Sequence, residues 1–179
     1  MPGVRMGEIA VAGGAEELVA LGLGSCIGLA IVDWRAGVAG LAHVVLPHSG
    51  GRAQQPGRFA DTAVPALVSA LRGAGASPRR LRAVIAGGAQ MFRSSASLDV
   101  GARNDRAVRE ALCAARITLG AARTGGAQGR TLRVSLAEGL VTVRVAGEPA
   151  ATLLEAPDPP GATDRRCRPA GSLLIAGRP

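Results

Sequence analysis

The clearest pattern of apolar and polar positions lies in the first third of the chain, where two runs of Val, Ile, Leu and Ala flank a short polar segment. The runs span 27–33 and 38–45, and the residues between them are typical of a turn. Short apolar runs bounded by turn residues predict a β-hairpin. If Asp33 pairs with Val38, the register of the whole hairpin follows, whereas a slip by one residue would move each side chain to the opposite face.

Further strand-like runs follow at 81–86, 117–121, 131–135 and 140–145. The last two are joined by Glu138 and Gly139, which predicts a second hairpin. The uncharged run 18–32 is shorter than a membrane span and is interrupted by glycines, so we interpret it as buried strand and turn and expect no membrane insertion.

Two segments repeat apolar residues at the spacing of one helix face. The first is expected to begin at Asp61 as its cap and to stop at Gly73. The second is expected to begin near Asn104 as its cap, with Cys113 as a small, partly buried side chain beside the inward stripe. The predicted inward positions are Val64, Leu67, Val68 and Leu71 in the first helix, and Val108, Ala111, Leu112 and Ala115 in the second.

The composition changes after Gly147. Residues 148–179 are rich in Pro, Ala, Arg and Gly and lack periodicity until a brief apolar run at 173–176. We expect a poorly ordered tail at 148–179 behind one domain formed by residues 1–147.

Charge and cysteine content narrow the classes of function. The net charge is +8, but every basic residue is Arg and the arginines are scattered, so nucleic-acid binding is not favoured; an acidic protein partner fits better. Three cysteines without CxxC spacing predict neither a disulfide framework nor a zinc site, and they fit a reducing cytoplasm. Two histidines and scattered carboxylates form no recognisable metal-ligand set, so we expect no metal.

One segment could carry chemistry, because a thiol follows a glycine-rich turn directly at the start of a strand. Cys26 comes after Gly24 and Ser25, whose backbone could approach a substrate closely and help to stabilise an oxyanion. A dinucleotide-binding loop is excluded, because the glycines are spaced GxGxxxG and a strand follows instead of a helix.

A thiol needs a base to become a nucleophile at neutral pH. In the expected hairpin register, His43 lies diagonally across from Cys26 on the same face, about 7 to 8 Å away between Cα atoms. Cys26 and His43 are therefore the candidate nucleophile and general base. Taken alone, Cys26 is more typical of an inert buried cysteine and His43 of a structural histidine. The spacing and the pairing make the catalytic interpretation equal to this one, and both stay open at this point. His48 follows Pro47 in an expected loop and fits a surface position better than a catalytic one.

Six ordered blocks carry a resemblance to a known family. They are LGLGSC at 21–26, GLAHVVLP at 40–47, RFADTAVPAL at 58–67, GGAQMF at 87–92, VGARNDRAV at 100–108 and TGGAQGR at 124–130. In this order, across roughly residues 4 to 146, they resemble the CheD family of chemoreceptor glutamine deamidases.

The resemblance implies an α+β fold, with mixed β-sheets in a layered sandwich packed against two main helices, similar to the catalytic domains of toxin-type cysteine deamidases. It implies that Cys26 attacks the side-chain amide of a receptor glutamine, with His43 as the base, through a thioester that water hydrolyses to glutamate. Some relatives also hydrolyse glutamate methyl esters. The implied partners are the cytoplasmic domains of methyl-accepting chemoreceptors, and no cofactor is implied.

One position departs from the family pattern. The family usually places a Thr six residues before the cysteine, where its hydroxyl supports the histidine, whereas this chain has Ala20. A backbone carbonyl or Ser25 could replace that support. The departure also favours an alternative, a weakly active homologue that acts as a binding partner of the CheC-type chemotaxis phosphatase.

Overall fold

A computed structural model describes residues 3–51, 55–90 and 99–157 of the chain. In chain order its elements are β1 (Ile9–Gly13), β2 (Glu17–Leu23), β3 (Ile27–Asp33), β4 (Val38–Val44), α1 (Ala60–Gly73), β5 (Arg82–Gly87), α2 (Val100–Ala114), β6 (Thr118–Thr124), β7 (Arg130–Ser135), β8 (Leu140–Val145) and β9 (Ala151–Glu155), with short 3-10 turns at Pro56–Arg58 and Pro78–Arg80.

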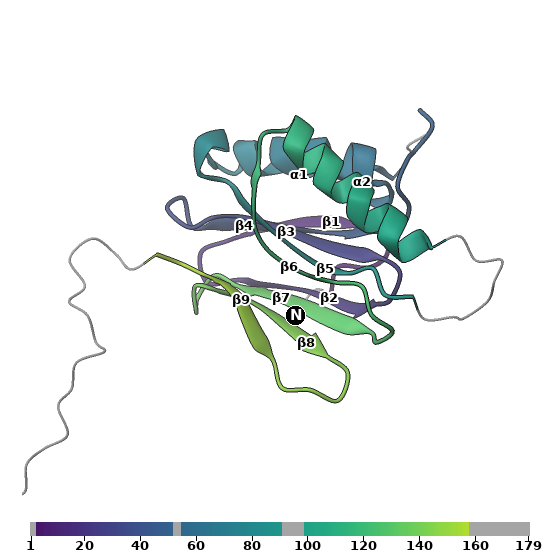
Figure 1. Cartoon of the computed structure of the whole chain (residues 1–179). Coiled ribbons are helices and arrows are strands. Elements are labelled where there is room, and N and C mark those ends of the chain that lie inside the picture. The colour runs from purple at the N-terminus through teal and green to yellow at the C-terminus, as the bar shows by residue number, and fades with distance from the viewer. Residues whose placement is uncertain (1–2, 52–54, 91–98, 158–179) are drawn as a thin grey trace, which may run out of the picture.

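The elements form three layers (Figure 1). The middle layer is a five-stranded mixed sheet in the order β1-β4-β3-β5-β6, and a four-stranded antiparallel sheet in the order β2-β7-β8-β9 lies on one side of it. Helices α1 and α2 cover the other face of the five-stranded sheet. The predicted α+β class, with two helices packed on layered sheets, is confirmed.

The central hairpin has the expected register. Asp33 pairs with Val38, and the antiparallel ladder continues to Ile27 opposite Val44. Every residue of β3 and β4 is buried, because these strands lie between the helices and the second sheet. Alternate side chains therefore enter two different cores, one beneath the helices and one between the sheets.

Helix α1 differs from the prediction at its start. It begins at Ala60 with Phe59 as its N-cap, and Asp61 lies in the first turn. The Asp61 carboxylate does not cap the helix, because it accepts hydrogen bonds from the amide and the hydroxyl of Ser49. The end at Gly73 is confirmed.

Helix α2 begins earlier than predicted. Its cap is Asp99, whose carboxylate accepts from the amide of Ala102 at 2.9 Å. Asn104 lies inside the helix and is fully buried, so its assignment as the cap is wrong. Cys113 is exposed instead of partly buried, and Ala115, which follows the last helical residue, is exposed as well.

Two strands were not expected as separate elements. The edge strand β1 pairs with β4, and β9 adds to the edge of the second sheet beside β8. Because β9 lies within 148–179, the expected tail begins too early; residues 158–179 fall outside the described residues. Within the described ranges, no helix has the length and apolar character that a membrane crossing requires.

Candidate functional site

Cys26 lies in the turn between β2 and β3, with its side chain half-buried at the edge of the core between the two sheets. Two backbone hydrogen bonds fix this turn against the end of β5. The amide of Gly88 donates to the carbonyl of Cys26 at 2.8 Å, and the amide of Ala89 donates to the carbonyl of Gly24 at 2.7 Å. The thiol is therefore held on a rigid turn, although it lies outside regular structure.

The end of β5 approaches this turn so closely that only glycine fits at its last position, Gly87. Gly87 has a φ of +114°, and a Cβ atom there would collide with the carbonyl oxygen of Cys26. A side chain at Gly101, in the first turn of α2, would likewise collide with the carbonyl of Gly88. The glycines in the 87–92 and 100–108 blocks thus allow the β5 end to pack between the cysteine turn and α2.

His43 is buried near the end of β4, opposite Gly28 of β3. Its Nδ1 lies 3.3 Å from the carbonyl oxygen of Val4. Because a carbonyl can only accept, this contact assigns the proton to Nδ1 and leaves Nε2 with its lone pair when the ring is neutral. Nε2 is buried and has no hydrogen-bond partner within the described part of the chain.

The hairpin brings the two candidate residues to one face. Gly28 is the cross-strand partner of His43, and Cys26 precedes Gly28 by two residues, so both side chains belong to the face that meets the second sheet. The structure contains no hydrogen bond between the thiol and the imidazole: the Cys26 turn and His43 are both described, and Nε2 is unpaired. Such bonds are often long in substrate-free enzymes.

The surroundings favour the neutral form of both groups. Burial raises the pKa of the Cys26 thiol above its ordinary value. Burial also lowers the pKa of His43, and the hydrogen bond to Val4 offsets only part of that effect. At rest the thiol is therefore protonated and the imidazole is neutral, so the imidazole can accept a proton.

The other two predicted residues of the site, Gly24 and Ser25, shape the turn. Gly24 is buried and donates its amide to the carbonyl of Gly22 at 2.9 Å. The amides of Ser25 and Cys26 donate to no backbone carbonyl of the described residues. These two amides, and not that of Gly24, are available to an oxyanion beside the thiol.

A side chain outside the predicted set also holds the turn. The Nδ2 atom of Asn104 donates to the carbonyl of Ser25 at 2.9 Å and to that of Val45 at 2.8 Å. The sequence does contain a signal for this role. Asn104 lies four residues before Val108 on the inward stripe of α2, where a polar side chain must be buried and needs partners.

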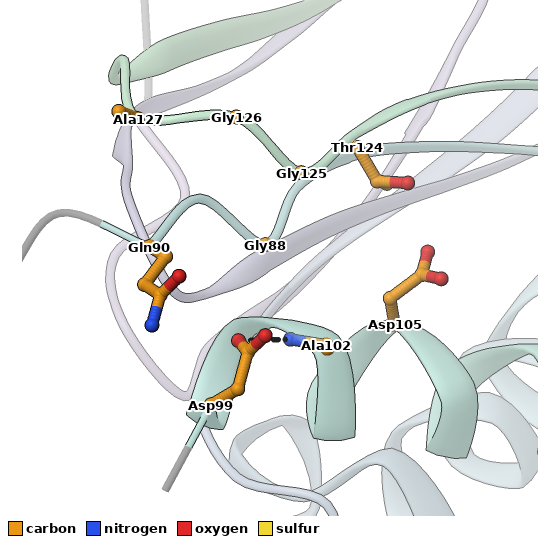
Figure 2. Close-up of a pocket in the computed structure, with 9 residues that line it drawn as sticks. All are labelled: Gly88, Gln90, Asp99, Ala102, Asp105, Thr124, Gly125, Gly126 and Ala127. Carbon is orange, nitrogen blue, oxygen red and sulfur yellow. Dashed lines mark hydrogen bonds between the residues drawn. The ribbon is translucent and has the colours of Figure 1, made fainter. Parts of the chain in front are cut away.

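A pocket of about 590 Å³ adjoins the Cys26 turn through Gly88 (Figure 2). Its walls come from three of the sequence blocks, 87–92, 100–108 and 124–130, together with the α2 cap Asp99. The side chains of Asp105 and Thr124 extend from opposite walls of this pocket (Figure 2). Blocks that are far apart in the sequence therefore meet at a pocket whose residue Gly88 bonds to the backbone of the Cys26 turn.

A second pocket, of about 560 Å³, reaches His43 itself. Val4, Met6 and Leu21 line it. Met6 is 67% exposed and Leu21 is 62% exposed, and they are the strongly exposed large apolar side chains of the described residues. Exposed apolar side chains therefore lie beside the candidate base, together with the charged residues Arg5 and Glu8.

Ala20 is fully buried on the inward face of β2, in the core between the two sheets that His43 also faces. Its methyl group cannot accept or donate a hydrogen bond, so the only hydrogen bond to the His43 ring from the described residues is that of the Val4 carbonyl. Sequence patterns could not identify Val4, because any residue has a carbonyl.

Three or more potential metal ligands do not cluster anywhere in the described ranges.

Comparison with known proteins identifies relatives along most of the chain. The family model described as CheD chemotactic sensory transduction matches residues 45–145. This match covers the three blocks that line the pocket beside Gly88, and it begins two residues after His43.

Individual relatives extend the similarity. The probable chemoreceptor glutamine deamidase CheD of Symbiobacterium thermophilum is 48% identical over 151 residues, which cover 80% of this chain and 92% of that protein. The chemoreceptor glutamine deamidase CheD of Thermotoga maritima is 44% identical over 144 residues, 80% of this chain and 91% of that protein. The probable chemoreceptor glutamine deamidase CheD of Methanococcus vannielii is 40% identical over 147 residues, 81% and 95% of the two chains.

Proposed function

This chain belongs to the CheD family, and on that premise we propose that it is a chemoreceptor glutamine deamidase that uses Cys26 as nucleophile and His43 as general base. The relatives named as such enzymes cover four fifths of the chain. The substrates are glutamine side chains in the cytoplasmic domains of chemoreceptors, and the products are glutamate and ammonia. The reaction takes place in the cytoplasm, where these domains lie.

In the first half of the reaction, the Cys26 sulfur attacks the carbon of the glutamine carboxamide. Its proton passes to Nε2 of His43, which carries the free lone pair because Nδ1 is bonded to Val4. The amides of Ser25 and Cys26 donate to the oxygen that becomes negative. His43 then gives the proton to the departing nitrogen, ammonia leaves, and a thioester remains.

In the second half, His43 accepts a proton from water, and the resulting hydroxide attacks the thioester carbon. The carbon–sulfur bond breaks, the sulfur regains a proton from His43, and the receptor side chain leaves as glutamate. One histidine acts as base and acid in turn, as in other acyl-transfer enzymes. These steps need no group beyond the substrate, water and the chain itself.

One observation carries the proposal: Cys26 and His43 lie on the same inward face of one hairpin, with Nε2 buried and unpaired. A buried lone pair without a partner costs free energy, so its presence calls for an explanation. Accepting the thiol proton is such an explanation.

The test is ammonia release from a purified chemoreceptor cytoplasmic fragment that carries glutamine at its modification sites. The same fragment with glutamate at those sites is the control substrate. Release from the first fragment only, and its loss in Cys26→Ala and His43→Ala, supports the proposal. Equal release by Cys26→Ala contradicts it.

A second candidate function rests on Ala20, which leaves His43 without the side-chain support usual in the family. In that case the chain acts mainly as a binding partner of a CheC-type chemotaxis phosphatase and is only weakly active. Titration calorimetry with such a phosphatase distinguishes the two. Tight binding that Cys26→Ala leaves unchanged, together with negligible ammonia release, favours the binding function; no binding excludes it.

A further inference from the structure

We propose that Asn104 is a positioning residue that joins the nucleophile turn to the strand of the general base from the far side of the sheet. Neither the sequence blocks nor the names of the relatives assign it a role. This inference rests on the proposed function, because it concerns the geometry of the Cys26 and His43 pair.

Asn104 lies where the hairpin ladder ends. Strands β3 and β4 exchange hydrogen bonds up to Ile27 and Val44, and beyond that pair the chain turns away on both sides. Val45 comes directly after Val44 and Ser25 lies two residues before Ile27, and the carbonyl of each accepts one hydrogen from the Nδ2 atom of Asn104, at 2.8 and 2.9 Å. One amide group thus closes the open end of the hairpin.

The two carbonyls are close to the reacting side chains along the chain. Ser25 immediately precedes Cys26, and Val45 follows His43 by two residues. A shift of the Ser25 carbonyl changes the direction of the thiol, whereas a shift of Val45 changes the end of the strand that carries the imidazole. Asn104 links these two movements, so it sets the separation of the nucleophile and the base.

The chemistry of the contact requires an amide. Both partners are carbonyl oxygens, which only accept, so the atom that faces them must be the nitrogen, with two hydrogens to donate. Aspartate has nearly the same shape but presents an acceptor to two acceptors. The side chain is fully buried, and its Oδ1 atom has no partner among residues 3–51, 55–90 and 99–157. The amide therefore serves these two carbonyls alone.

The direct test compares Asn104→Asp with the wild-type chain in the ammonia-release assay. We expect kcat to fall by about 10- to 100-fold with KM within about 2-fold, because misplacement by about 1 Å affects the chemical step and not substrate binding. Asn104→Ala, which removes the donor without adding an acceptor, serves as the second variant and is expected to behave similarly. Unchanged kcat in both variants overturns the inference.

Val108→Ala is the matched control. Val108 lies one turn further along α2, is fully buried, and packs in the core beneath the helices, where its apolar side chain makes no hydrogen bond to the Cys26 turn. The Val108→Ala substitution should lower the melting temperature, while kcat should stay above about half of the wild-type value. Equal losses of kcat in Val108→Ala and the Asn104 variants, at equal melting temperature, show a merely structural role and overturn the inference.

A second readout separates this inference from the proposed function. The rate of alkylation of Cys26 by iodoacetamide is followed on the tryptic peptide 6–35, which contains no other cysteine. Release of the turn exposes the thiol, so Asn104→Asp should react faster at neutral pH, with the midpoint of its pH profile lowered, whereas Val108→Ala should match wild type. An unchanged alkylation profile in Asn104→Asp overturns the inference about Asn104. A wild-type chain that releases no ammonia contradicts the proposed function instead, and the alkylation test can still be carried out on such a chain.

Discussion

The Nδ1 atom of His43 lies 3.3 Å from the carbonyl oxygen of Val4, so a backbone group of the N-terminal segment holds the candidate base. The same segment is fixed in turn by the amide of Val4, which donates to the carbonyl of Val19 in β2 at 2.8 Å. A carbonyl of the chain thus occupies the orienting role that Ala20 cannot fill.

Removal of residues 1–5 should therefore lower kcat by about 10-fold, a fraction of the roughly 10²- to 10⁴-fold that acid–base catalysis contributes. The matched control is Val4→Ala, which keeps the carbonyl and loses only part of the side-chain packing. Steady-state kinetics with the glutamine-bearing receptor fragment measures both. If the truncated chain keeps full kcat, the Val4 carbonyl does not orient His43.

The pH profile of kcat/KM should reflect two neutral groups. Burial lowers the pKa of His43, so activity should be retained below the ordinary imidazole pKa of about 6.5 and be lost only as the ring becomes protonated at lower pH. Burial raises the pKa of Cys26, so alkylation of the free thiol should increase only above the ordinary range of cysteine. The measurement covers about pH 5 to 8, on both sides of the ordinary imidazole pKa of about 6.5. Alkylation that is fast and constant over this range would indicate a preformed thiolate and contradict this description.

Substrate binding should depend on the apolar surface beside His43. Met6 and Leu21 line the pocket that reaches this residue and are mostly exposed. Replacing either with Ser should raise KM by about 5-fold, equivalent to about 1 kcal/mol of lost apolar contact, with little change in kcat. Equal KM values for Met6→Ser, Leu21→Ser and wild type would exclude this surface from receptor binding.

An ion pair at the opposite end of the hairpin should matter for stability alone. Asp33 is fully buried and bonds to the Arg80 guanidinium at 2.8 Å and to the amides of Ser77 and Ala36. Arg80→Ala should lower the free energy of unfolding by about 1 to 3 kcal/mol, because the carboxylate keeps only its backbone donors. Arg79→Ala, at the neighbouring exposed position, is the control and should have little effect.

The same pair predicts a dependence on pH. Burial alone would raise the pKa of Asp33, but the hydrogen bonds from Arg80, Ser77 and Ala36 and the charge of Arg80 outweigh it and leave the pKa below its ordinary value. The contribution to stability should be complete above the ordinary carboxyl pKa and be lost as pH falls through the lowered value of the folded state. Urea unfolding from pH 7 down to about pH 2, below the ordinary carboxyl pKa, measures it; a difference between wild type and Arg80→Ala that persists at the acid end contradicts the assignment.

The sequence predicted the centre of the fold better than its edges. The hairpin of β3 and β4 was predicted because two strong apolar runs flank a short polar turn, and the structure has the register in which Asp33 pairs with Val38. Strands β1 and β9 are only five residues long and lie at sheet edges, so their stability depends on a neighbouring strand more than on their own residues. Asp61 and Asn104 were misread as caps, because both side chains bind groups distant in sequence.

For the site, the sequence indicated which residues meet but not what holds them. In the structure His43 pairs with Gly28, and Cys26, just outside the ladder, packs against the core between the sheets; the catalytic roles of both residues stay predictions. The Val4 carbonyl is a backbone group without a sequence signature. The position of Asn104 on the stripe of α2 was visible, whereas its two partners depend on the packing of α2 against the end of the hairpin.

The most direct test of the central claim is the intact mass of a receptor fragment after incubation with the chain. A cysteine-dependent deamidase should add about 1 Da for each converted glutamine, and in the presence of hydroxylamine the trapped thioester should add about 16 Da instead, as the hydroxamate. Both changes should be absent with Cys26→Ala. An unchanged mass with the wild-type chain, or the same increase with Cys26→Ala, would contradict the assignment of Cys26 as the nucleophile of a glutamine deamidase.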